Sequence, residues 1–316
     1  MRVVFFGTSE FAVPSLEALV AHKQALLLCV TQPDRPQGRG LRPAPSPVKT
    51  VALRLGAPLQ QPEQLHRGLF EAWRPDVGVV IAYGRLIRQD LLEWPAHGML
   101  GVHPSLLPRY RGAAPVAWAL LNGETTTGVT IFRLNERLDA GDMLLQRPVT
   151  VQPEEDAEQL TRRLALLGAQ TLVEGIEALA TGRAAWSAQD ESRASLAPKL
   201  TKAQGRVDWQ KPAQTIERLV RALVPWPGAM CAWQGRELKL WKVSVSEALK
   251  NPSGMVPGTV MRVDDQSVTV ATGHGALTLH EVQPAGRRRM PIKEFLAGHP
   301  VHVGDRLQTS DFRHQT

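Results

Sequence analysis

The sequence predicts an α/β fold, with a domain built on a parallel sheet followed by a small β-barrel domain. Over the first half of the chain, apolar and β-branched runs alternate with helical stretches, which is typical of a parallel sheet covered on both faces. The last third contains short alternating strands separated by glycine-bearing turns, which favours a barrel. A chain of 316 residues is long enough for about two domains.

The first domain opens with a buried strand and a helix. The strand is expected at 3–7, and the helix after it has Pro14 near its start, where proline is tolerated. Only Gly7 follows this strand, so the glycine cradle of a dinucleotide-binding site is missing and NAD-dependent chemistry is excluded. Further buried strands are expected within 25–34, 76–84 and 97–103.

Two more strands and a long helix complete this domain. Strand-like runs at 128–134 and 143–151 flank a Leu-Asp-Ala-Gly-Asp turn at 138–142. Leucine and isoleucine keep helical spacing from 154 to 181, with acidic residues first and Gly182 last, which suits the helix dipole and a C-cap. One long amphipathic helix should therefore end the domain.

A polar, irregular segment divides the chain. We expect a catalytic domain over 1–182, a linker over 183–203 and the barrel domain over 204–316. The barrel domain begins with one helical run, and five short strands follow it.

Composition and cysteine usage limit the class of protein. Cys29 and Cys231 have neither CxxC nor zinc spacing, so neither a disulfide framework nor a metal is expected. The N-terminal apolar run is too short for a secretory core, and no run approaches about 18 apolar residues. We expect a cytoplasmic monomer without membrane association.

Positive charge is clustered in two segments. The formal net charge is +7, and basic residues gather at 34–49 and 286–293. The first cluster contains four prolines and is expected to be an exposed loop, neither helix nor central strand. Either cluster alone could be a solvated surface, but together they favour a nucleic-acid partner.

The candidate chemistry lies in a Pro- and Gly-rich loop that begins at His103. An imidazole at the end of a strand in an α/β sheet is well placed for proton transfer, although His103 could also be structural. Asp142 could be a turn former, or it could face His103 and make an acid–base couple. No Ser elbow or activated Cys is present, so the sequence predicts direct transfer to a group supplied by a substrate.

Ten segments together resemble the bacterial methionyl-tRNA formyltransferases, a family of folate-dependent formyltransferases, from about residue 1 to about residue 300. The pattern Ser-Leu-Leu-Pro-x-x-Arg-Gly is shared with folate-dependent formyltransferases and hydrolases in general. The early arginine loop, VPWPG and VQPAG are more specific to the tRNA enzymes. The segments are FFGTSEFAVPSLEAL, TQPDRPQGRG, PSPVK, VVIAYG, HPSLLPRYRGAAP, GVTIFRL, LDAGDM, KLTKAQGRVDW, VPWPG and VQPAGRRRM.

The resemblance implies a Rossmann-like catalytic domain and a barrel of the oligonucleotide-binding (OB) type. It also implies that 10-formyltetrahydrofolate donates its formyl group to the amino group of methionyl initiator tRNA for translation initiation. His103 and Asp142 would serve the proton transfers. The folate pocket would be lined by Ser105, Leu106, Leu107 and Pro108. The tRNA would contact Arg39, Arg42, Arg287, Arg288, Arg289 and Lys293.

Gly101 departs from this family, whose motif has Asn two residues before the histidine. Ala117 likewise replaces a common Gln. A missing oxyanion donor typically costs about 10²- to 10³-fold in rate, so transfer is expected to be weakened and Gly101→Asn to raise it. A water or backbone N–H could donate instead, or the backbone could require glycine.

Three other functions stay open from the sequence. They are formylation of a small amine such as an amino sugar, noncatalytic binding of tRNA or folate, and hydrolysis of formyl-folate.

Overall fold

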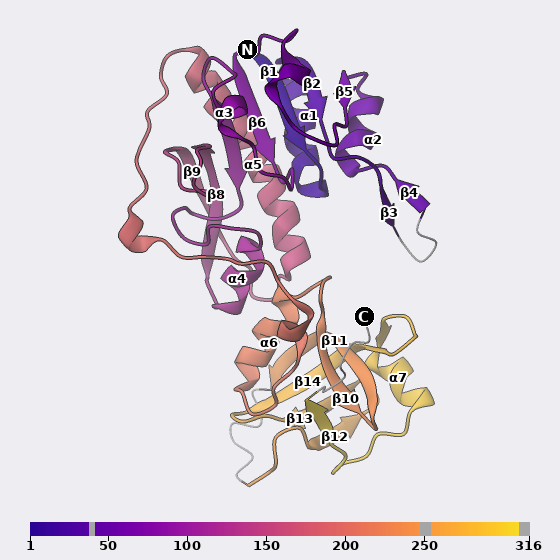
Figure 1. Cartoon of the computed structure of the whole chain (residues 1–316). Coiled ribbons are helices and arrows are strands. Elements are labelled where there is room, and N and C mark those ends of the chain that lie inside the picture. Colours follow the sequence, from indigo (N-terminus) through magenta and orange to yellow (C-terminus); the bar gives the residue numbers. More distant parts are fainter. Residues whose placement is uncertain (38–41, 247–253, 310–316) are drawn as a thin grey trace. The chain divides into compact units, whose positions relative to one another are not determined.

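Two compact units make up the chain, and a computed structural model describes residues 1–37, 42–246 and 254–309 (Figure 1). The predicted linker is divided between them, because its residues up to Pro198 belong to the first unit. The first unit comprises Met1–Pro115, Thr125–Val151 and Leu160–Pro198, and the second comprises Val116–Glu124, Gln152–Gln159 and Lys199–Thr316.

The first unit contains a seven-stranded sheet in the order β5-β2-β1-β6-β7-β8-β9. The first five of these strands run parallel, and β8 and β9 are antiparallel additions at one edge. The predicted α/β architecture and each predicted strand of this domain are confirmed. The strands are β1 (Arg2–Gly7), β2 (Ala25–Val30), β5 (Leu59–Gln60), β6 (Val77–Ile81), β7 (Met99–His103), β8 (Thr126–Arg133) and β9 (Met143–Thr150).

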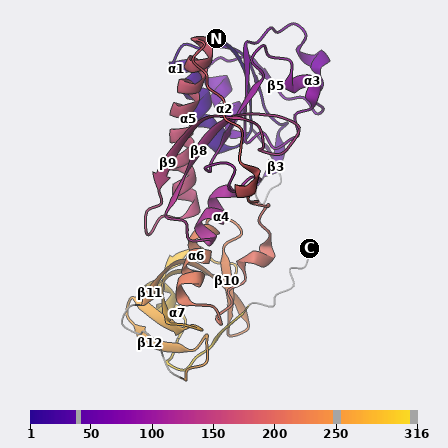
Figure 2. The ribbon, with the colours of Figure 1, turned by 90° about the vertical axis from the view of Figure 1, so that its left-hand side faces the viewer.

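Helices and apolar segments cover both faces of this sheet (Figure 2). On one face, Leu100 and Val102 pack with apolar residues of α1, α2 and α5. Met99 packs on the other face with an aromatic cluster, so Gly101 and His103 share that second face because side chains alternate along β7. The helices of this unit are α1 (Val13–Ala21), α2 (Pro47–Arg54), α3 (Gln89–Leu92) and most of α5 (Ala157–Ala180), whereas α4 (Pro115–Leu121) belongs, apart from Pro115, to the second unit.

Helix α5 confirms the predicted long helix. At its start the Asp156 carboxylate accepts the Gln159 N–H at 2.9 Å, and the Gln159 side chain accepts the Asp156 N–H at 3.0 Å. This reciprocal cap satisfies two helix-end donors. Gly182 has φ 69° just after the helix, the left-handed conformation that glycine adopts easily.

The segment 34–49 contains more regular structure than predicted. Strands β3 (Arg35–Gln37) and β4 (Arg42–Ala44) form an antiparallel hairpin outside the main sheet. The prediction that no part is helical is wrong, because α2 begins at Pro47, a first-turn position that proline tolerates. Lys49 Nζ forms an ion pair with Asp34 Oδ2 at 2.6 Å, next to the first residue of β3.

The second unit is a curled antiparallel sheet in the order β12-β13-β14-β11-β10-β16, with β15 paired to β14. Thr259 and Arg306 form a bridge between its two end strands, and Val260 N–H donates to Asp305 O at 2.8 Å, so the sheet curls into a barrel-like form. Its elements are α6 (Ala213–Ala222), β10 (Ala229–Trp233), β11 (Arg236–Ser246), β12 (Val260–Asp264), β13 (Ser267–Ala271), β14 (Ala276–Pro284), β15 (Met290–Pro291), α7 (Ile292–Gly298) and β16 (Leu307–Thr309).

Candidate active site

His103 ends β7 and is 6% exposed. Its Nε2 atom lies 2.8 Å from the carbonyl oxygen of Tyr110. A carbonyl can only accept, so Nε2 carries the proton of this hydrogen bond. The other ring nitrogen, Nδ1, faces Asp139 Oδ2 at 3.7 Å, and it is therefore the nitrogen able to exchange a proton beside a carboxylate.

The carboxylate beside His103 is Asp139, whereas the sequence analysis pairs His103 with Asp142. Asp142 is exposed and has no ion pair with the imidazole, although its carbonyl accepts the Arg133 N–H at 2.8 Å. That backbone bond ties Asp142 to the sheet edge. The structure therefore places Asp139, and not Asp142, beside His103, and a role for His103 and a carboxylate in proton transfer stays a prediction.

Asp139 is held by contacts from other parts of the chain. Its φ of 50° lies in the left-handed region, which only a few per cent of non-glycine residues adopt. Its Oδ2 accepts the Gly112 N–H at 2.8 Å, and its carbonyl accepts Gln189 Nε2 at 2.8 Å. Gly141 must be glycine, because a Cβ there would overlap the Arg133 carbonyl oxygen. Asp139, Gly112 and Gln189 were not predicted as site residues, and only the turn motif around Asp139 gave a signal in the sequence.

Gly101 lies opposite Phe132 on the neighbouring strand. A Cβ at position 101 would lie 2.7 Å from Phe132 Cζ and 2.8 Å from Leu134 Cδ1. The Phe132 ring also packs edge-on against His103, with centroids 6.4 Å apart. Gly101 lies within a regular strand and has no positive φ, so it accommodates a close side-chain approach and not a backbone bend.

The predicted folate segment, Ser105–Pro108, is largely buried and uses its polar groups internally. Thr130 Oγ1 donates to Ser105 O at 2.7 Å and accepts the Leu107 N–H at 3.1 Å. Gln146 Nε2 donates to Thr130 Oγ1 and to Leu107 O, both at 2.9 Å. This buried network fixes the loop that follows His103, and ligand contact by the segment stays a prediction.

A cavity of about 630 Å³ lies near the start of β7 and the end of β8. Its walls come from residues 89–98 and 133–137, and Leu134 both lines it and contacts the Cβ position of Gly101. Neither His103, Asp139 nor the segment Ser105–Pro108 lines this cavity, so it is not part of the site around His103.

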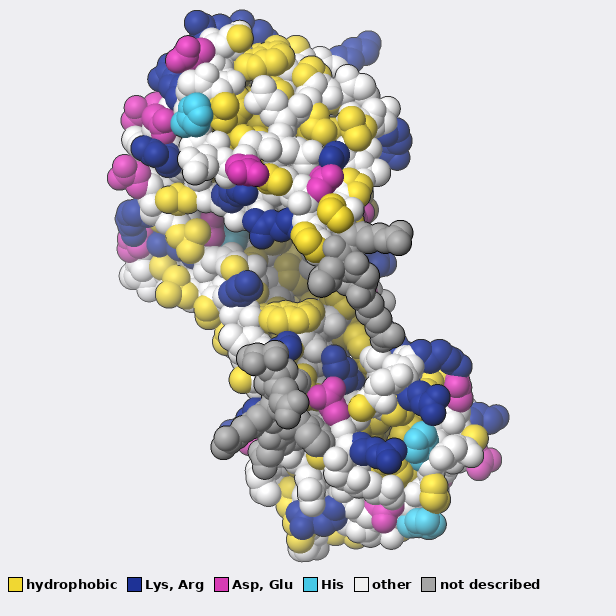
Figure 3. All heavy atoms as spheres, turned by 45° about the vertical axis from the view of Figure 1, so that its right-hand side comes forward, with side chains coloured by type: hydrophobic (Ala, Val, Ile, Leu, Met, Phe, Trp, Pro, Cys, Tyr) yellow, Lys and Arg dark blue, Asp and Glu magenta, His cyan; other side chains and the backbone are white. Residues whose placement is uncertain are grey.

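The predicted tRNA-binding arginines are only partly described. Arg39 lies outside the described residues, and Arg42 begins β4 with its side chain undescribed. On the face drawn in Figure 3, Lys and Arg side chains are spread over both units.

The second basic cluster is partly neutralised by acidic neighbours. Arg288 pairs with Glu294 at 2.6 Å, and Arg289 pairs with Glu281 at 2.5 Å. Arg287 and Lys293 are exposed, and neither has an ion pair in the part of the chain that the structure describes. Binding of tRNA by these residues stays a prediction.

Both cysteines are buried and free. Burial raises the pKa of the Cys29 thiol to about 12 and raises the pKa of Cys231 as well. A thiol that stays protonated is a poor nucleophile, so neither cysteine offers covalent catalysis. Among the described residues, no three His, Cys, Asp or Glu side chains are grouped to hold a metal, and no helix has both the length and the hydrophobicity to cross a bilayer.

Family comparisons fit this fold and site. The formyl transferase family matches residues 1–176, and the formyl transferase C-terminal domain family matches residues 199–300. The chain therefore belongs to the formyl transferase family.

The chain is similar to methionyl-tRNA formyltransferases along nearly its whole length, which confirms the resemblance seen in the sequence. The enzyme of Trichlorobacter lovleyi is 44% identical over 97% of this chain and 96% of that relative. The enzyme of Roseiflexus castenholzii is 45% identical over 97% of this chain and 99% of that relative.

Solved structures share the fold at low identity. HypX from Aquifex aeolicus, in complex with tetrahydrofolic acid, has a TM-score of 0.63 and 22% identity over 98% of this chain, which spans 51% of HypX. Methionyl-tRNA formyltransferase from Clostridium thermocellum has a TM-score of 0.54 and 13% identity over 78% of this chain and 94% of its own.

Proposed function

We propose that this chain transfers the formyl group of 10-formyltetrahydrofolate to the α-amino group of methionyl initiator tRNA. The observation that carries the proposal is the His103–Asp139 pair in a chain 44% identical to a methionyl-tRNA formyltransferase over 97% of its length. We also keep the prediction of a cytoplasmic monomer, which cell fractionation and size-exclusion chromatography test.

His103 and Asp139 have complementary roles in this proposal. An amine that is acylated must lose a proton, and Nδ1 of His103 is the ring nitrogen free to take it, because Nε2 donates to Tyr110. The Asp139 carboxylate stabilises the resulting imidazolium and orients the ring. A buried, tightly held imidazole is suited to this role.

The folate donor should bind against Ser105–Pro108, the segment that follows His103 and that the Thr130 hydroxyl holds in place. The donor supplies the activated formyl group when bound. We infer that transfer is slower than it would be with a carboxamide at position 101, because one oxyanion donor typically contributes about 10²- to 10³-fold.

The test is a single-turnover assay with purified protein, 10-formyltetrahydrofolate and methionyl initiator tRNA. Formyl-methionyl-tRNA should accumulate, and tRNA binding should weaken steeply with salt. Formylation of an amino-sugar nucleotide without tRNA would favour the small-amine alternative. Release of formate without an acceptor would indicate a hydrolase. Binding of both ligands with no product, even at high enzyme concentration, would indicate a noncatalytic relative.

A further inference from the structure

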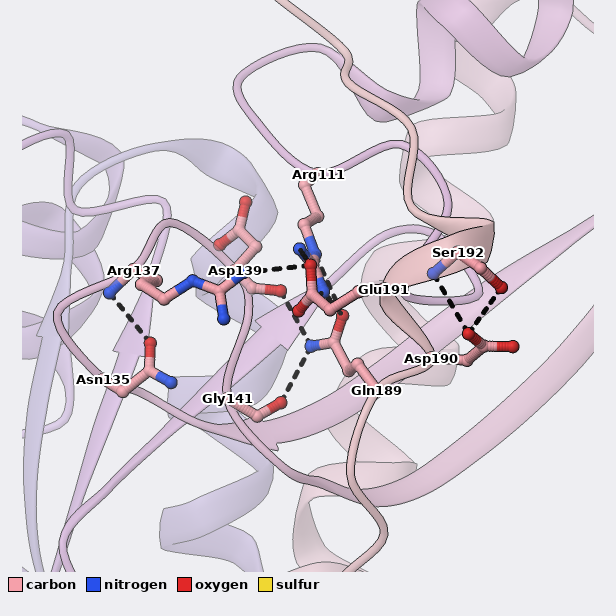
Figure 4. Close-up of polar contacts among 9 residues, drawn as sticks. All are labelled: Arg111, Asn135, Arg137, Asp139, Gly141, Gln189, Asp190, Glu191 and Ser192. Carbon is pink, nitrogen blue, oxygen red and sulfur yellow. Dashed lines mark hydrogen bonds and ion pairs between the residues drawn. The ribbon is translucent and has the colours of Figure 1, made fainter.

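The segment 183–198 does more than lead out of the first unit, because it is hydrogen-bonded to both loops of the candidate site. Ser195 O accepts the Arg111 N–H at 2.8 Å, and Ser195 Oγ accepts the Tyr110 N–H at 2.9 Å. At the other loop, Gln189 Nε2 donates to the carbonyls of Asp139 and Gly141, both at 2.8 Å (Figure 4). One short segment thus contacts the backbone on both sides of the His103–Asp139 pair.

Gln189 connects the two loops through a single side chain. Its Oε1 accepts from Arg111 Nε at 3.0 Å and from Nη2 at 2.7 Å. The Arg111 side chain is only 7% exposed, and Glu191 neutralises it through contacts of 3.0 and 3.1 Å. Because a guanidinium only donates and a carbonyl only accepts, the orientation of the Gln189 amide is fixed. A neutral amide is suited to this position because its oxygen accepts from the guanidinium while its nitrogen donates to the two carbonyls.

Asp139 depends on this contact for its position. It has the uncommon φ of 50°, and within the described part of the chain no other hydrogen bond reaches the carbonyls of Asp139 or Gly141. Among the described residues, the Asp139 carboxylate contacts His103 and accepts the N–H of Gly112, which follows Arg111 in the loop that Gln189 also holds. Loss of the Gln189 side chain would therefore remove the hydrogen bond to the Asp139 carbonyl and also weaken the loop that carries the Gly112 N–H.

We propose that Gln189 is a positioning residue for the transfer reaction, holding Asp139 toward His103. This inference rests on the proposed function for its kinetic part, but not for its structural part. It makes Gln189, within the segment 183–198, a component of the site.

The matched variants are Gln189→Glu and Ser192→Ala. A glutamate keeps an acceptor for Arg111 but turns the donor end into an acceptor facing two carbonyls. Ser192 lies in the same segment, on an exposed turn, and its hydroxyl donates only to Asp190 at 2.7 Å. Ser192→Ala therefore controls for general loosening of the segment.

The structural readout is amide hydrogen exchange in the free protein. In Gln189→Glu, peptides that cover 110–114 and 139–142 should exchange faster, because the Gly112 N–H loses its fixed acceptor. Ser192→Ala should exchange as the wild type does in these peptides. A melting curve checks that each variant is folded.

The kinetic readout is single-turnover formyl transfer combined with a double-mutant cycle. Gln189→Glu should slow transfer by about 10- to 100-fold, as expected for a small misplacement of a catalytic group, with little change in the KM for Met-tRNA. In an Asp139→Asn background, the same substitution should have little further effect, because it acts through Asp139.

Wild-type exchange in both peptides would overturn the inference. Faster exchange with an unchanged transfer rate would also overturn it, because the contact would then hold the loop without serving the reaction. So would a full additional loss of rate in the Asp139→Asn background. If the wild-type chain formylates nothing, the proposed function fails, and the exchange experiment alone decides whether Gln189 holds Asp139 in place.

Discussion

The Phe132 ring occupies the space in which a side chain at position 101 would begin. The two residues are directly opposed on β7 and β8, and a Cβ on Gly101 would lie 2.7 Å from the ring. An aromatic side chain packed over a cross-strand glycine is a stabilising arrangement. The Phe132 ring therefore fills the space that the family's asparagine side chain would occupy. The ring supplies no hydrogen-bond donor in place of that carboxamide.

Gly101→Asn alone should therefore destabilise the fold and fail to restore a working carboxamide. This prediction differs from the expectation from sequence that the substitution raises the rate. Forcing a side chain against Phe132 and Leu134 should cost about 1–3 kcal/mol. Chemical denaturation of the single variant, of Phe132→Ala and of the double variant measures the coupling. The double variant should be less destabilised than the sum of the two; strict additivity would contradict the predicted overlap.

Thr130→Val should destabilise the loop after His103. The hydroxyl donates to Ser105 O and accepts from Leu107 N–H and Gln146, so a methyl group leaves buried partners unpaired. The expected loss is about 3 kcal/mol of unfolding free energy. Thr127→Val, at another buried position of β8, is the comparison in the same denaturation assay, since no side-chain hydrogen bond of Thr127 is recorded among the described residues. Equal losses in the two variants would argue against the network.

Asp76→Asn should lower the melting temperature at pH 7, with a difference that disappears in acid. The Arg2 side chain and backbone N–H hydrogen-bond to Asp76 and hold the pKa of that carboxyl below its usual value. A lowered pKa stabilises the folded state above the unfolded pKa, near 4, and this contribution is lost as the pH falls further. Melting curves from pH 7 to 3 should show the two proteins converging. Asp265→Asn, at an exposed turn, provides the control.

Arg287→Ala with Lys293→Ala should reduce the salt dependence of tRNA binding. Both side chains are exposed and have no recorded carboxylate partner among the described residues, so each can contact a phosphate at no cost in broken ion pairs. Each phosphate contact contributes about 0.9 to the slope of log K against log salt, so the slope should fall by about 2. Arg288→Ala, which removes an arginine already paired with Glu294, should change it less. An unchanged slope in the double variant would remove the barrel cluster from the tRNA contacts.

Local sequence patterns were sufficient for most elements. Period-two and apolar runs predicted β7 and β8, and leucine spacing with Gly182 predicted α5, because these signals depend on neighbours in sequence. The helix start at Pro47 was missed because the surrounding prolines favour a loop equally well.

The site was only partly predictable, because it depends on contacts between distant segments. Asp139 and Asp142 flank the same Ala-Gly pair, and nothing local tells which faces His103. The choice follows from the Gly112 N–H and from Gln189, which is 50 residues away from Asp139. The position of Phe132 over Gly101 likewise requires the register of β7 against β8.

The most direct test of the account compares Asp139→Asn with Asp142→Asn in single-turnover formylation of methionyl initiator tRNA. Asparagine at 139 can still accept the Gly112 N–H but cannot stabilise an imidazolium, so transfer should slow by about 10²-fold or more. Asp142→Asn should react at nearly the wild-type rate. A large loss in Asp142→Asn with wild-type transfer in Asp139→Asn would contradict the assignment of the catalytic pair.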